Sequence, residues 1–84
     1  MLDEEMFLGG ERITRKAFEN SSSLAFASYD KVANELEVTF KNGTRYRYFG
    51  VQQQLVTDLF EAQSVGKFFQ AVIKKGSFKF ERVT

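Results

Sequence analysis

The chain has 84 residues, of which 43% are hydrophobic and 27% charged, and its net charge is +1. This length suits one small domain, and the charge balance does not by itself indicate a nucleic-acid-binding protein. The absence of Cys and His excludes disulfides, the usual zinc ligands, and thiol or imidazole catalysis. We therefore expect a non-catalytic binding domain with no cofactor and no metal. No segment approaches the roughly 18 apolar residues of a membrane span, so the cytoplasm is the expected location.

Residues 1–20 differ from the rest of the sequence, and we expect them to form an N-terminal extension of a domain that spans residues 21–84. Within the extension, residues 11–19 are compatible with a short helix because Ile13 and Ala17 have helical spacing. A disordered terminus is the alternative. A polar Asn-Ser-Ser-Ser segment then leads into the domain.

Three strands are predicted next, over residues 24–29, 35–40 and 45–49. The second alternates strictly between polar and apolar residues, which is typical of a half-buried strand. The Asn42-Gly43 pair after it indicates a tight hairpin.

The loop length of this hairpin decides which side chains share a face. A two-residue loop would set the apolar face of one strand against arginines of the other. A three-residue loop with Gly43 in the left-handed conformation satisfies both faces, so we prefer it. That register makes four pairs: Val38 with Tyr46, Leu36 with Tyr48, Glu37 with Arg47, and Thr39 with Arg45.

Two helices and a last strand complete the predicted fold. Apolar residues at helical spacing indicate helices over residues 52–63 and 64–75, the second capped by Ser64 and ended by Gly76. Residues 78–82 alternate as a strand. The predicted fold class is α+β, a small antiparallel sheet in β-β-β-α-α-β order with both helices packed on one face.

From Ser21 onward the sequence resembles the KTSC domain, a short bacterial module named for the C-terminus of some lysyl-tRNA synthetases and also found alone. The resemblance covers about three quarters of the chain. It is carried by Tyr29-Asp30, Leu36-Glu37-Val38-Thr39-Phe40, Asn42-Gly43, Tyr46-Arg47-Tyr48, Gly50-Val51 and residues 62–69. Gln52 stands where the family usually has Pro. The family's function is not established, and the synthetase connection implies RNA binding by analogy.

Three segments are candidates for binding RNA or another single-stranded nucleic acid. The first is Arg45-Tyr46-Arg47-Tyr48, where exposed rings would stack on bases and guanidinium groups would hold phosphates; the alternative is that both tyrosines belong to the core. The second is the Ser64-to-Lys67 turn, and its alternative is a simple helix cap. The third is a basic groove with stacking aromatics, formed by Lys74, Lys75, Lys79 and Arg82 around Phe78 and Phe80; the alternative is an edge strand protected by its lysines. The predicted binding residues are Arg45, Tyr46, Arg47, Tyr48, Lys67, Lys74, Lys75 and Lys79.

A protein-interaction domain of a phage or mobile-element kind is the second hypothesis. Such a domain would engage a protein, or a second copy of itself, through residues 1–20 or an uncovered sheet edge. A monomer and a homodimer both remain open. No catalytic residue is predicted, because Glu35 and Glu37 share a strand face with no pocket indicated between them.

Overall fold

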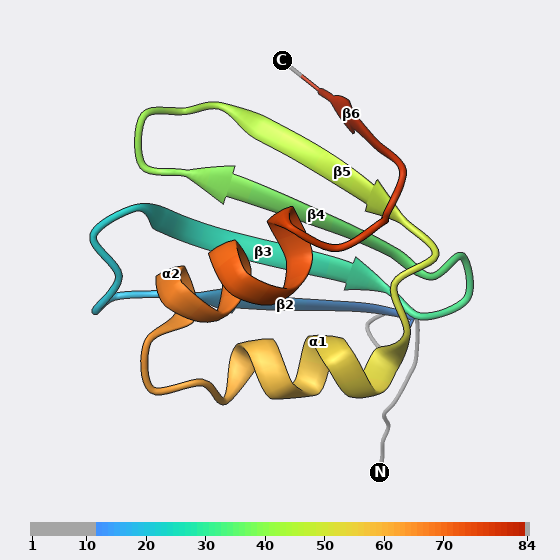
Figure 1. Ribbon diagram of the computed structural model, residues 1–84, viewed down its shortest axis with the longest axis horizontal. Coiled ribbons are helices and arrows are strands. Elements are labelled where there is room, and N and C mark those ends of the chain that lie inside the picture. The colour runs from blue at the N-terminus through green and yellow to red at the C-terminus, as the bar shows by residue number, and fades with distance from the viewer. Residues whose placement is uncertain (1–11, 84) are drawn as a thin grey trace, which may run out of the picture.

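A single antiparallel sheet organises the tertiary structure, a computed structural model that describes residues 12–83. Its strands lie side by side in chain order, and the helices cover one of its faces (Figure 1). The strands are β2 (Ile13–Ala17), β3 (Leu24–Asp30), β4 (Glu35–Phe40), β5 (Arg45–Phe49) and β6 (Phe80–Arg82). The predicted α+β class is confirmed, with the helices inserted between the fourth strand of the sheet and the last.

The first strand, β2, corrects one prediction. The structure shows a strand rather than a helix within residues 11–19, and all five residues of β2 are exposed. It pairs antiparallel with β3, which places Lys16 opposite Ala27. The backbone groups at the β3 edge are satisfied by this pairing, and that non-local gain outweighs the weak helical spacing of the segment. The predicted extension upstream of Arg12 lies outside the described residues.

The β4–β5 hairpin has the predicted register. Val38 lies opposite Tyr46, Leu36 opposite Tyr48, and Glu37 opposite Arg47. Gly43 has a φ of +93°, and its N–H donates to the carbonyl of Phe40 at 2.9 Å. Only glycine adopts this conformation at little cost, so Gly43 favours the three-residue loop. The loop sets the register of the two strands, and the register decides which side chains face inward.

Two helical segments lie between β5 and β6 in the chain, and the turn at Ser64 connects them. They are α1 (Gln53–Phe60) and α2 (Val65–Phe68), and the latter continues as η2 (Phe69–Lys74), whose wider π-helical turns end the segment. The hydroxyl of Ser64 accepts a hydrogen bond from the Lys67 N–H at 3.4 Å, which confirms the predicted cap. No helix within residues 12–83 is long and apolar enough to cross a membrane.

The core lies between the sheet and the helices. The sheet contributes Ala27, Tyr29, Leu36, Val38 and Tyr48, and the helices contribute Val56, Leu59, Phe69 and Ile73. Burial of these apolar side chains is the main stabilising contribution for a domain of this size. Within residues 12–83, the opposite face of the sheet carries no helix (Figure 1), and it is the face onto which Glu37 and Arg47 project.

Candidate nucleic-acid interface

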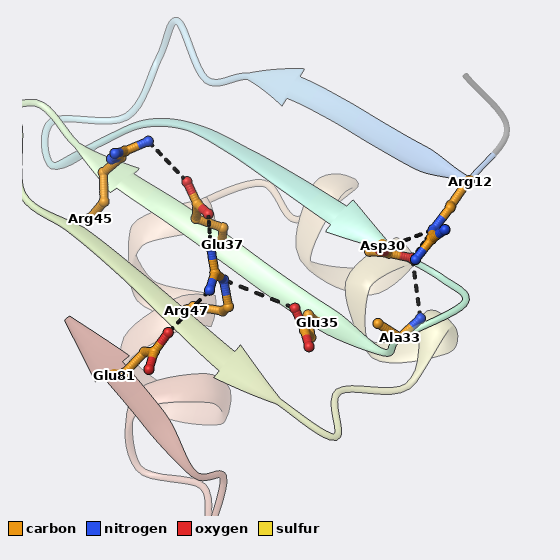
Figure 2. A network of polar contacts seen from close by, with 8 residues as sticks. All are labelled: Arg12, Asp30, Ala33, Glu35, Glu37, Arg45, Arg47 and Glu81. Atoms are coloured by element: carbon orange, nitrogen blue, oxygen red, sulfur yellow. Dashed lines mark hydrogen bonds and ion pairs between the residues drawn. The ribbon is translucent and has the colours of Figure 1, made fainter. Parts of the chain in front are cut away.

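The uncovered face of the sheet carries the predicted arginines, and carboxylates neutralise them. Glu37 lies between the two guanidinium groups, with its carboxylate oxygens 3.3 Å from Arg45 Nη1 and 3.3 Å from Arg47 Nη2 (Figure 2). Arg47 also pairs with Glu81 at 3.0 Å and with Glu35 at 3.9 Å. A phosphate approaching these arginines would have to displace carboxylates already in place. This network is therefore a poor phosphate site.

A second ion pair occupies the end of the same face. The Nε of Arg12 lies 3.2 Å and 3.1 Å from the two carboxylate oxygens of Asp30. The same carboxylate accepts from the N–H groups of Val32 and Ala33 in the β3–β4 turn. Arg12 and these backbone donors hold the pKa of Asp30 below its usual range. Asp30 is thus a structural residue of the turn.

The two predicted tyrosines of β5 point toward the helices. Tyr48 is 5% exposed, and its ring centroid lies 5.8 Å from that of Phe69. Burial, with a smaller contribution from Tyr46, raises the pKa of Tyr48. Tyr46 is only half-buried. Tyr48 is therefore inaccessible to a nucleotide base, as the alternative prediction of core tyrosines required.

A polar hollow of about 780 Å³ lies between the β2–β3 loop and the start of α2. Lys16, Lys67 and Lys75 border it from β2, from α2 and from the residue after η2. The rest of its wall is divided equally between hydroxyl or amide side chains and apolar residues or glycine, with Glu19 as the one carboxylate. The first group is Asn20, Ser21, Ser22, Ser23, Gln63, Ser64 and Gln70, and the second is Ala17, Phe18, Phe60, Ala62, Val65, Gly66 and Ala71. We call this hollow the lysine cleft.

Two local features set the shape of the lysine cleft. The hydroxyl of Ser21 accepts from the N–H groups of Ser23 and Leu24 at 3.3 and 3.0 Å, which folds the loop back. Opposite it, Gly66 comes so close that a Cβ there would lie 3.2 Å from the Ser23 hydroxyl oxygen. Glycine at position 66 thus lets α2 approach the loop on the other side of the cleft.

The lysines of the cleft are free of ion pairs with the rest of the described chain. Within residues 12–83, Lys16, Lys67 and Lys75 form none, nor do the predicted Lys74 and Lys79. The structure therefore brings together two predicted residues, Lys67 and Lys75, and leaves Lys74 and Lys79 outside the cleft. Lys16 was not among the predicted binding residues, because a helix was expected in that segment. Lys16 lies opposite the buried Ala27, and residues that lie opposite each other in paired strands project to the same face of the sheet. Lys16 therefore faces the helices.

Comparison with known proteins agrees with this architecture. The model of the KTSC domain family matches residues 20–78. An uncharacterized protein from Stutzerimonas stutzeri is 40% identical over 63 residues, which cover 75% of this chain and 89% of that protein. A lysine–tRNA ligase from Nostoc punctiforme is 39% identical over 57 residues, which cover 68% of this chain and 10% of the ligase. A crystal structure of a KTSC domain protein from Yersinia pestis superposes with a TM-score of 0.75 at 32% identity, covering 86% of this chain and 99% of the other.

The fold and the cleft define a two-layer α+β domain in which three lysines without an ion pair in residues 12–83 border one hollow beside α2. The chain belongs to the KTSC domain family.

Proposed function

We propose that this domain binds RNA and that the lysine cleft holds the phosphate backbone. The observation that carries the proposal is the convergence of Lys16, Lys67 and Lys75, from three separate elements, on one hollow whose wall also contains four serines. Ammonium groups supply the sequence-independent attraction to phosphates, and hydroxyl and amide groups add hydrogen bonds to phosphate oxygens. The name of one relative, a lysine–tRNA ligase, supports RNA as the ligand.

The distribution of acidic residues supports the cleft over the uncovered sheet face. Glu35, Glu37 and Glu81 all contact Arg47 on that face, whereas Glu19 is the one acidic side chain among the residues that line the cleft. The attraction of a polyanion depends on the summed charge near it. The cleft therefore keeps a positive excess where the arginine network does not.

The test is a binding titration of single-stranded and tRNA-like RNA at two salt concentrations. Wild-type affinity should fall as salt rises. In a plot of the logarithm of the binding constant against the logarithm of the salt concentration, each single-strand phosphate contact should add roughly −0.7 to the slope. The double variant K67A/K75A should bind more weakly and with a shallower slope. The double variant K31A/K41A removes the same charge from exposed lysines outside the cleft and is the matched control.

Three outcomes decide the proposal. No binding by the wild type at low salt would end it. Equal losses in K67A/K75A and K31A/K41A would show diffuse attraction without a cleft site. If R45A/R47A weakens binding more than K67A/K75A does, the RNA binds at the arginine network and not at the cleft.

A protein-interaction role is the second candidate, and β2 favours it. Among the strands of residues 12–83, β2 lies at one edge of the sheet, and all five of its residues are exposed, so its outward backbone groups can accept another strand. Phe18 N–H donates to Ala25 at 2.9 Å, so by alternation the N–H of Ala17 points away from β3. Concentration-dependent dimerisation in sedimentation velocity, abolished in A17P, would support pairing of two β2 edges. A monomer at every concentration would exclude that pairing.

A further inference from the structure

An exposed aromatic side chain lies at the β6 end of the sheet, on its helix side. Phe80 is 60% exposed, and among residues 12–83 it is the only large aromatic residue with such exposure. Its ring centroid lies 6.0 Å from that of Tyr46 and 5.4 Å from that of Tyr48. The helices leave all three residues of β6 exposed (Figure 1). Phe80 is thus supported by β5 from beneath while much of its ring remains in contact with solvent.

The charge next to Phe80 on this face is positive. Phe80 lies opposite Tyr48, and Arg82 lies opposite Tyr46, so strand alternation places both side chains on the helix side. Glu81 projects to the other face, where it pairs with Arg47 at 3.0 Å. Arg82 has no ion pair within residues 12–83. A supported aromatic ring with an uncompensated guanidinium beside it is the arrangement that binds an unpaired base and its phosphate.

We propose that Phe80 and Arg82 form a stacking site for one unpaired base of a single-stranded RNA segment. This proposal rests on the proposed function and deepens it, because it names the strandedness of the ligand. Bases of a duplex are stacked on one another and are unavailable to Phe80, whereas a single strand can turn a base outward. The lysine cleft would hold phosphates of the same strand without distinguishing its bases.

The chain contains no Trp, so F80W introduces a single indole at the proposed site, which can be excited at wavelengths where tyrosine does not absorb. A single-stranded oligonucleotide should quench its fluorescence, because a base stacks on the indole, and a duplex of the same sequence should leave it nearly unchanged. F80A should weaken single-strand binding by about 5- to 150-fold, which corresponds to the usual cost of losing one stacked base. R82Q should weaken binding and reduce its salt dependence.

Two control variants separate stacking from general effects. V32A truncates another exposed apolar residue, which is 65% exposed on the β3–β4 turn, and it should leave affinity unchanged. F80L keeps an apolar side chain without a flat ring, so it should bind nearly as weakly as F80A. Circular dichroism and thermal unfolding establish that each variant is folded.

The outcomes distinguish this site from the lysine cleft. If F80A binds single strands as tightly as V32A does while K67A/K75A binds weakly, the stacking site is wrong and the cleft stands. Equal quenching of F80W by single strand and duplex would also overturn stacking. If the wild type binds no RNA at low salt, both proposals fail together.

Discussion

The hydroxyl of Tyr29 donates a hydrogen bond of 2.6 Å to the carbonyl oxygen of Val51, which is buried just before α1. The side chain of Asn34 donates to the same hydroxyl and the same carbonyl, at 3.2 and 3.3 Å. Asn34 holds this position with a φ of 58°, a conformation that Asn tolerates better than most residues. The β3–β4 turn is thereby attached to the chain that enters α1, across the edge of the core.

Removal of the hydroxyl group should have different effects on stability at the two buried tyrosines, because only that of Tyr29 makes a hydrogen bond within residues 12–83. Y29F should lower the free energy of unfolding by about 1 kcal/mol, because a buried hydrogen bond is lost. Y48F should be neutral or slightly stabilising, since Tyr48 is 5% exposed and its hydroxyl makes no hydrogen bond within residues 12–83. Urea denaturation of both variants measures the difference. Equal losses would show that the Tyr29 hydroxyl contributes nothing specific.

Tyr48 also predicts how stability depends on alkaline pH. Its pKa is raised in the folded state, so the folded protein keeps the phenol proton after the unfolded chain has lost it. Stability from this group is fully present below the unfolded value of about 10 and falls as pH rises from there through the folded pKa. Tyrosinate absorbance of the wild type should therefore contain a late-titrating component that is lost in Y48F. A late component of the same size in Y48F would contradict the prediction.

Gly76 is predicted to tolerate no side chain, for steric rather than conformational reasons. Its φ is outside the left-handed region, unlike that of a typical C-terminal helix glycine. A Cβ there would lie 2.7 Å from the Val72 carbonyl oxygen and 2.9 Å from the Phe78 ring. G76A should therefore destabilise by about 1–3 kcal/mol through overpacking. S77A, at the exposed neighbouring position, is the control, and an equally small effect in both variants would refute the steric explanation.

Gly66 and Ser23 should be energetically coupled. Replacing a helical glycine by alanine usually stabilises by about 0.5–1 kcal/mol, but here the new Cβ would press on the Ser23 hydroxyl. G66A should therefore stabilise an S23A background more than it stabilises the wild type. A double-mutant cycle in thermal or urea unfolding measures the coupling. Additive effects would mean that the loop moves freely away from α2.

Glu37 should stabilise the uncovered face by a small, salt-sensitive amount. E37Q removes the carboxylate between Arg45 and Arg47 and should cost about 0–1 kcal/mol, as partly exposed pairs do. The loss should shrink at high salt because the pairs are screened. Thermal unfolding of wild type and E37Q at low and high salt tests this. A loss that grows with salt would require another role for Glu37.

The sequence by itself determined the features encoded between near neighbours. Alternation over β4 and the Gly43 turn fixed the hairpin register, because a one-residue slip would have placed arginines in the core. Helical spacing located α1 and the capped start of α2. The register also predicted that Tyr48 would point inward.

Only the tertiary structure decided the features that depend on distant partners. Residues 13–17 became a strand because the β3 edge satisfied their backbone groups. Arg47 is unavailable to a phosphate because it pairs with Glu81, a residue 34 positions away in the sequence. Lys16 and Lys67, from different elements, line the same cleft. The local spacing of apolar residues indicates which side of a segment faces the core. The net charge of a surface depends instead on which elements meet there, and only folding brings these elements together.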